Sequence, residues 1–349
     1  MTRQKPSIVV IGGGTGTSVV LEGLKHRDLD LTAIVTAFDS GGSSGRLGEE
    51  FGHLSQGDLR RCLVALAEES PETEALRIAT RYRFSSASSL SGHNLGNLFL
   101  SALTVQYSDI EVAVALMSRM LRISGRVLPV ALEPRDLCAE LVDGSHLRGE
   151  ATIDMRRSNP PQIKRVYLDR SVETNPRAID AIANADVIVL GPGDLYTSII
   201  PNLLVEGVAP AIRGSRGHVI YVSNLMTKHG ETDGFSVGDF ASEISSYLHH
   251  TRIDTLLINT APVPVDVQTA YSSVNAVPVT LAGRPVPECV NETVGLPLIR
   301  VFHTKEPGEL RVRHDPALLA DALMGIASAA TRSEQLYTLA GQEMAHAAD

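Results

Sequence analysis

Residues 7–24 read SIVVIGGGTGTSVVLEGL, and this stretch decides the fold class. The β-branched run from Ser7 to Ile11 predicts a buried strand, the glycines after it predict a tight loop, and the apolar residues of 19–24 recur at helical spacing. A second apolar run, Leu31 to Phe38, ends at Asp39. Strand, helix and strand in this order form a βαβ unit, so we expect a parallel sheet with a right-handed crossover.

The rest of the chain extends this pattern. We expect one domain over residues 1–349, a Rossmann-like three-layer α/β/α fold with a mainly parallel sheet and a small β-rich insertion. Its expected parts are helical cover over about 58–122 (58–69, 72–83, 94–106, 109–122), the insertion over about 125–170 (strands 127–132, 163–168), the resumed sheet over about 186–280 (strands 187–190, 219–222, 253–258) and a C-terminal helix over about 316–345.

Composition excludes several classes of protein. The 349 residues carry 31 Lys and Arg against 40 Asp and Glu, a net charge of −9, which argues against binding to a nucleic-acid polymer. Cys62, Cys138 and Cys289 lie too far apart for a disulfide framework or a metal knuckle, which favours a cytoplasmic protein. No apolar stretch is long enough to predict a membrane span.

The loop after the first strand predicts an anion site. Glycines let a ligand approach the backbone, and a helix N-terminus offers N–H groups to a phosphate. The candidate residues are Gly13, Gly14, Thr15 and Gly16. A dinucleotide fingerprint counted from Gly12 fails because Thr17 stands at its third glycine, although Asp39 stands where a ribose-binding acid is expected. A tight turn without a ligand is the alternative.

The segment from Asp39 to Arg46 predicts a second glycine loop. A carboxylate, small residues and an arginine together can wrap an anion or hold a metal ion through Asp39. The candidates are Asp39, Ser40, Gly41, Gly42, Ser43, Ser44 and Arg46. A surface loop without a ligand is the alternative.

Four further segments carry polar residues toward the same edge of the sheet. Asp58 is expected to cap a helix that presents Arg60, and Gly92–Asn97 crowds a histidine and two asparagines at a helix start that needs one cap. Gly191-Pro192-Gly193-Asp194 repeats the strand-to-helix geometry of the first loop, and Asn224 follows a later strand. The additional candidates are Asp58, Arg60, His93, Asn94, Asn97, Gly191, Gly193, Asp194, Thr197, Asn202, Asn224, Thr227 and Glu231. Parallel sheets bind ligands at the carboxyl ends of their strands, so we expect these segments to form one shared cleft. The alternatives are that Arg60 is exposed to solvent and that Asn94 and Asn97 have a purely structural role.

In order and spacing, these segments resemble the YvcK-like gluconeogenesis factors, within the group related to CofD, the 2-phospho-L-lactate transferase. The resemblance runs from Ile8 to about Val279. It rests on VVIGGGTGTSVVLEGLK, AFDSGGSSGRL, GDLRRCLVAL, YRF followed by LSGHNLGNLFLSAL, ADVIVLGPGDLYTSIIPNLLVEGV and VSNLMTKHGET. It implies a cytoplasmic bacterial protein that binds uridine diphosphate sugars, notably UDP-N-acetylglucosamine, and is associated with gluconeogenic growth, cell shape and cell-wall precursor supply.

The resemblance also implies residue roles. Gly13 to Gly16 would lie near the ligand phosphates, Asp39 would be the metal or ribose acid, and the cleft would be lined by Asn94, Asn97, Gly191, Gly193, Asp194, Thr197 and Asn224. The family usually has Pro-Pro at residues 55–56, serine at Asp194, and Gln-Pro at residues 228–229. An extra carboxylate beside a phosphate loop repels a diphosphate, so Asp194 is expected either to recruit a metal ion or to change the ligand.

Three functional hypotheses follow. The first is a regulatory protein that binds a small phosphorylated nucleotide, is read by partner proteins and, by resemblance, forms a homodimer. The second is a CofD-like transferase in which Asp39, with Asp194 as a further candidate ligand, holds Mg²⁺ against a phosphate, so that Asp39 would be the catalytic residue. The third is an NAD-binding protein, which Asp39 favours and the failed fingerprint opposes.

Overall fold

The centre of the computed structural model is one parallel sheet. The structure describes residues 5–85, 89–156, 160–303 and 310–330. The strands lie in the spatial order β10 (Val290–Leu296), β9 (Ile253–Asn259), β8 (His218–Val222), β7 (Val187–Leu190), β1 (Ser7–Gly12), β2 (Asp30–Val35) and β3 (Arg126–Pro129). Every neighbouring pair is parallel. The chain builds from β1 toward β3 and then resumes on the other side of β1, so the topological switch lies between β1 and β7.

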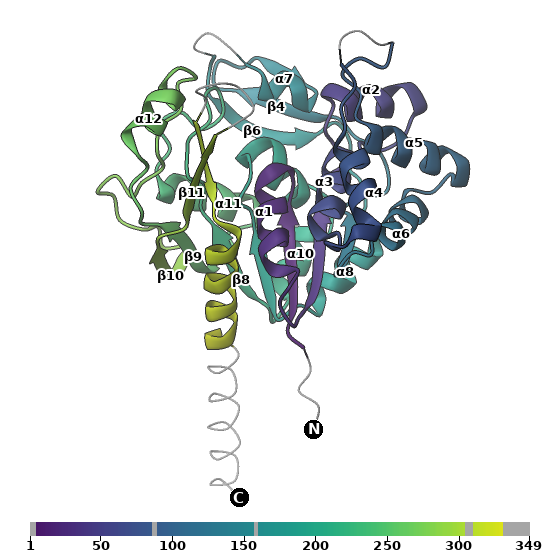
Figure 1. Ribbon diagram of the computed structural model, residues 1–349. Coiled ribbons are helices and arrows are strands. Elements are labelled where there is room, and N and C mark those ends of the chain that lie inside the picture. Colours follow the sequence, from purple (N-terminus) through teal and green to yellow (C-terminus); the bar gives the residue numbers. More distant parts are fainter. Residues whose placement is uncertain (1–4, 86–88, 157–159, 304–309, 331–349) are drawn as a thin grey trace, which may run out of the picture.

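Helices cover both faces of this sheet, which confirms the expected three layers (Figure 1). One layer contains α1 (Gly14–Leu24), α3 (Gly57–Leu66), α5 (Leu95–Tyr107), α6 (Ile110–Met120) and the helical residues 316–330. The other contains α8 (Pro176–Ala183), α9 (Ile200–Leu203), α10 (Val208–Gly214) and α11 (Val237–Tyr247). Strand β1 serves both cores, because Ile8 and Val10 pack toward the first layer and Val9 and Ile11 toward the second. None of the helices in these described ranges has the length and apolar character that crossing a bilayer requires.

A small antiparallel sheet forms the expected insertion. It consists of β5 (His146–Arg148), β4 (Leu137–Leu141) and β6 (Ile163–Leu168), with α7 (Glu150–Asp154) beside it. Figure 1 shows β4, β6 and α7 above the carboxyl ends of the main strands, on the same side as α2 (Gly42–Phe51). The expectation that 125–170 forms one insertion was wrong at its start. Strand β3 belongs to the main sheet, because the helices after β2 supply the crossover that a parallel neighbour needs.

The remaining helix and strand boundaries show which elements the local sequence pattern predicts and which it does not. The four predicted helices over 58–122 are confirmed as α3, α4 (Pro71–Arg81), α5 and α6, within a few residues at each end. The sheet does not end near residue 280, because β10 follows it, and an antiparallel hairpin of β11 (Ile299–His303) and β12 (Leu310–His314) leads into the last helix. α12 (Val265–Ser272) was not predicted either. The C-terminal helix is confirmed to residue 330, and the rest of its predicted range lies outside the described residues.

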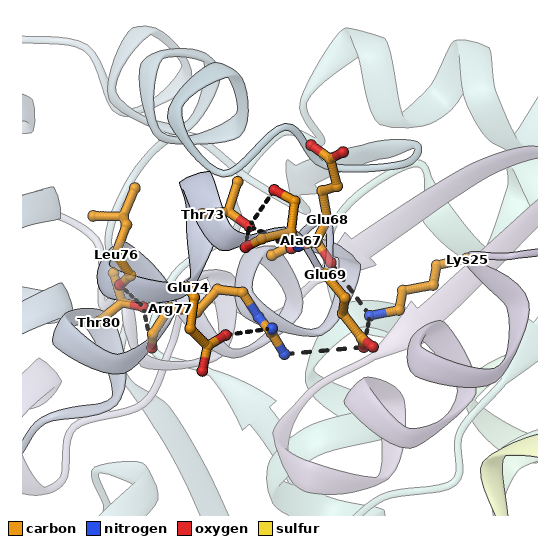
Figure 2. A network of polar contacts seen from close by, with 10 residues as sticks. Lys25, Ala67, Glu68, Glu69, Thr73, Glu74, Leu76, Arg77 and Thr80 are labelled. Atoms are coloured by element: carbon orange, nitrogen blue, oxygen red, sulfur yellow. Dashed lines mark hydrogen bonds and ion pairs between the residues drawn. The ribbon is translucent and has the colours of Figure 1, made fainter.

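A polar network fastens the start of α4 to the end of α1 (Figure 2). The buried Lys25 ammonium donates to the Ala67 carbonyl at 3.2 Å and to the Glu69 carboxylate at 2.7 Å. Arg77 pairs with Glu74 at 2.8 Å on the next turn of α4. Lys25 also lies at the carboxyl end of α1, where a positive charge is favourable. The network therefore fixes α4, the helix whose Thr80 carbonyl contacts Arg60 of the cleft.

Gly16 allows the first helix to approach the loop after β7. A Cβ at Gly16 would overlap the backbone carbonyl oxygen of Pro192, whereas a Cβ at Gly214 would meet nothing within 4 Å. We therefore expect Gly16→Ala to lower the free energy of unfolding by about 1–3 kcal/mol through overpacking. The control Gly214→Ala should leave it unchanged or raise it by up to about 1 kcal/mol. Urea denaturation measures both, and equal effects would contradict the close contact.

Candidate functional site

A cleft of about 480 Å³ lies at the switch point of the sheet. It is bounded by the loops after β1 and β7, the starts of α2 and α3, one residue of α5, Arg83 after α4, and α7. The sequence therefore correctly predicts that separate polar segments meet at one edge of the sheet. A volume of this size is typical of a site for a small molecule.

The first glycine loop forms the floor of the cleft, and a carboxylate already occupies part of it. The helix α1 begins at Gly14, whose N–H donates to the Asp58 carboxylate at 2.7 Å. The other oxygen of Asp58 accepts from Arg61 at 2.8 Å. Burial raises the pKa of Asp58, whereas Arg61 opposes this rise. The first-turn N–H groups of Thr15 and Gly16 come next along α1, where backbone donors have no partner within their own helix.

The prediction that Asp58 caps its own helix was wrong. Helix α3 begins at Gly57 with Gln56 at the N-cap position, so Asp58 lies within the first turn. Its side chain reaches the N-terminus of the neighbouring helix α1 instead. An acid at this position still compensates the positive end of a helix dipole, but the helix belongs to a different segment of the chain.

The second glycine segment is a loop only as far as Gly41. Helix α2 begins at Gly42, so the prediction of a loop through Arg46 was wrong. Asp39 stabilises this helix start, because one of its oxygens accepts from the Gly41 N–H and the other from the Ser44 hydroxyl, both at 2.7 Å. The Arg46 guanidinium donates to the carbonyls of Gly42 and Ser91 and does not line the cleft.

Two asparagines hold the segment after β7 in place, Asn202 against β1 and Asn224 against the end of β8. The Asn202 amide donates to the Gly12 carbonyl at 3.2 Å, and the Asn224 amide donates to the Gly193 carbonyl at 2.8 Å. The helix predicted after this loop is present, but its first turn is the π-helix η1 (Leu195–Ile199), which continues into α9. Both asparagines thus position the loop from behind the lining of the cleft.

One wall of the cleft is basic. Arg60 is buried, and its Nε donates to Asn97 at 2.8 Å while its guanidinium reaches the Thr80 carbonyl of α4 at 3.4 Å. Asn97 in turn donates its backbone N–H to Asn94, the N-cap residue of α5. Burial, followed by the charges of Arg61 and Arg83, lowers the pKa of Arg60 to about 10. Like charges held this closely are stabilised by an anion, so this wall is suited to phosphate.

A second wall of the cleft is acidic, and its two acids were not predicted from the sequence. Glu150 and Asp154 project from α7 and line the cleft. Burial, and then the negative charge of Asp39, raises the pKa of Glu150, which also hydrogen-bonds to Asp39. The signal in the sequence was the spacing of four residues between the two acids, which places them on one helix face.

Asp194 lies in contact with a lysine. The Lys228 ammonium lies 2.7 Å from Asp194 and 2.8 Å from Glu231, and it also contacts Asp154. Burial alone would lower the pKa of Lys228, but the three carboxylates raise it. Asp194 and Lys228, two positions at which the family resemblance predicts other residues, thus carry opposite charges and lie in contact. Within the described residues, the group of three carboxylates that could hold a metal ion is Asp154, Asp194 and Glu231, without Asp39.

Most of the predicted site residues line the cleft: Gly13, Gly14, Thr15, Gly16, Asp39, Gly41, Gly42, Ser43, Ser44, Asp58, Arg60, Asn97, Gly193, Asp194 and Thr197. The others lie around it without lining it: Ser40, Arg46, His93, Asn94, Gly191, Asn202, Asn224, Thr227 and Glu231. Lining residues outside the prediction are Gly57, Arg61, Arg83, Glu150, Ala151, Asp154, Met155 and Ser198. Direct contact of any of these with a ligand stays a prediction.

Comparison with known proteins gives one consistent result. Residues 8–294 match the family described as 2-phospho-L-lactate transferase CofD. The chain is 39% identical over 326 residues to the gluconeogenesis factor of Bacillus subtilis, covering 93% of this chain and 98% of that protein. It is 42% identical over 264 residues to the gluconeogenesis factor of Listeria monocytogenes, covering 75% of this chain and 80% of that one. A crystal structure of a Bacillus halodurans protein superposes with a TM-score of 0.84 at 36% identity, covering 92% of this chain and 100% of that chain.

The raised pKa of Glu150 predicts a dependence of stability on pH. The folded protein keeps this proton over a range in which the unfolded chain has lost it, so the free energy of unfolding falls as the pH rises above about 4.5. Glu150→Gln mimics the protonated form and removes this loss. We expect the variant to exceed the wild type by at least about 1.4 kcal/mol at pH 9, the equivalent of one pKa unit, and to match it near pH 4.5.

Urea denaturation at pH 5, 7 and 9 measures this difference. The control Glu288→Gln changes an exposed glutamate and should follow the wild type at every pH. A constant offset between Glu150→Gln and the wild type would contradict the proton-sharing arrangement.

Proposed function

This chain belongs to the CofD family, alongside relatives named gluconeogenesis factor, and on that premise we propose that it is a cytoplasmic regulatory protein that binds a nucleotide diphosphate sugar. The observation that carries this proposal is the cleft at the switch point, which is lined both by three arginines and by the first turn of α1. The diphosphate would lie between these two sources of positive potential. The identity of the base and sugar, as in UDP-N-acetylglucosamine, comes from the family resemblance, as do the roles in cell shape and cell-wall precursor supply.

The net charge of −9 is compatible with this ligand. Backbone N–H groups and a few arginines supply the positive potential locally, so the rest of the surface can remain acidic. Partner proteins that sense the bound state, and a homodimer, belong to the same proposal.

Binding of UDP-N-acetylglucosamine is the direct test. A ligand at about 100 times its dissociation constant should add about 2.7 kcal/mol to the free energy of unfolding, seen as a rise in the midpoint of thermal unfolding. UDP alone should give a smaller rise and uridine none. If no UDP-sugar shifts the midpoint, the proposal fails.

The arginine wall gives a sharper version of this test. Arg83→Ala should weaken UDP-N-acetylglucosamine at least about 10-fold, because a hydrogen bond to a charged group contributes about 1.5–3 kcal/mol. Arg126→Ala is the matched control, since Arg126 begins β3 at the opposite edge of the sheet. Calorimetry of both variants measures the effect, and equal affinities would place the phosphates elsewhere.

A transferase is the second candidate, favoured by the family match and by the contact between Asp39 and Glu150. Carboxylate oxygens are suitable ligands for Mg²⁺, and Asp39 would hold the ion there, where it would stabilise charge on a transferred phosphoryl group. Incubation with nucleotides, small phosphorylated acids and Mg²⁺ should then yield a product that Asp39→Asn does not form. Identical product profiles would remove this candidate. NAD binding is the third, and calorimetry without detectable NAD binding would remove it.

A further inference from the structure

Lys228 lies in the loop after β8 and makes an unusual set of contacts. Its ammonium contacts Asp194, Glu231 and Asp154, which come from the loop after β7, its own loop and α7. The ammonium donates hydrogen bonds to Asp154 and Asp194, and it forms an ion pair with Glu231. One side chain therefore joins three segments of the chain at the edge of the cleft.

The three carboxylates have the geometry of a cation site. One oxygen from each lies within 4.8 Å of the others. The side chain of Glu231 is fully buried, and its second oxygen has no hydrogen-bond partner among the described residues. Hard oxygen donors in this arrangement suit Mg²⁺, Mn²⁺ or Ca²⁺. A buried glutamate with an unused oxygen distinguishes this group from a chance cluster of surface acids.

A divalent ion and the lysine cannot both occupy this position. The ammonium already lies within 3 Å of two of the acids, in the position among the three carboxylates that a metal ion would take, and two cations placed there would repel each other. Asp154 and Asp194 also line the cleft, so whichever cation they hold decides how much negative charge faces the ligand.

We propose that Lys228 is the resident cation of a divalent-metal-type site formed by Asp154, Asp194 and Glu231, and that it replaces a metal ion there. As a second part, which rests on the proposed function, Lys228 neutralises Asp194 so that the cleft accepts a diphosphate without a metal ion at this position. Lys228 thus acts as a positioning residue through the three acids.

The first part is tested by counting bound Mn²⁺ in the metal-free protein, using electron paramagnetic resonance. Lys228→Gln should bind one more Mn²⁺ than the wild type, and the double variant Lys228→Gln/Asp194→Asn should lose it again. Lys228→Arg keeps the positive charge and should bind no extra ion. Absence of a gain in folded Lys228→Gln would overturn the proposal.

The wild-type background supplies a test that does not depend on the folding of a lysine variant. Asp194→Asn and the wild type should bind the same number of Mn²⁺ ions, because Lys228 already fills the site. Loss of one ion in Asp194→Asn would show that a metal displaces the lysine, and would overturn the proposal. These counts use no nucleotide, so they stand even if no UDP-sugar binds.

The second part compares affinities for UDP-N-acetylglucosamine with Mg²⁺ and with EDTA. We expect EDTA to weaken binding at least about 10-fold more in Lys228→Gln than in the wild type. An equal effect in both proteins would overturn the second part. Failure of both proteins to bind in either condition would instead contradict the proposed function.

Discussion

The close contact between the loops after β1 and β7 is the constraint on which the rest of the structure depends. Gly16 lies against the Pro192 carbonyl, and Asn202 and Asn224 bond to the carbonyls of Gly12 and Gly193. The contacts of Gly16 and Asn202 join β1 to the segment after β7, where the direction of winding reverses, and Asn224 ties the same loop to the end of β8. Both helix starts therefore face one crevice, and the segments that follow β2 and β8 need only short paths to reach it.

The insertion adds two acids to a cleft whose arginines all come from the main body of the chain. Two of the arginines come from α3, and the third, Arg83, lies shortly after α4 and forms a β-bridge with Asn94. The acids Glu150 and Asp154 come from the insertion. The insertion is a small sheet separate from the main sheet. The acidic wall therefore belongs to the insertion, whereas the basic wall belongs to the helices that cover the main sheet. Ser40 links the main sheet to the insertion by accepting a hydrogen bond from the Ala151 N–H at 3.0 Å, and Lys228 makes a second link through Asp154. The charge pattern of the cleft thus depends on how the insertion is held.

Local patterns in the sequence predict what is local in the structure. The glycine loops after β1 and β7 follow apolar strands directly, so their positions could be derived from a few residues each. The strand β10 could not, because VNETVGL lies at the sheet edge, is partly exposed and lacks an apolar run. Helix α2 was missed because glycine and serine are weak helix formers, whereas the hydrogen bonds that Asp39 accepts from Gly41 and Ser44 stabilise its start. Elements such as β10 and α2 form because of contacts with other segments of the chain, which a local sequence pattern does not contain.

Asp58 shows why the function of a glycine loop cannot be derived from the loop alone. The motif predicts N–H groups available to an anion, but the structure gives the Gly14 N–H to a carboxylate of another helix. Asp58 also engages Arg61, so the same acid uses one donor of the loop and one cation of the basic wall. An anion bound at α1, as proposed, would therefore meet Thr15 and Gly16 and compete with Asp58 for Arg61. The affinity of such an anion would depend on how much more strongly Arg61 interacts with the anion than with Asp58. That difference in free energy is a property of the folded cleft rather than of the glycine motif.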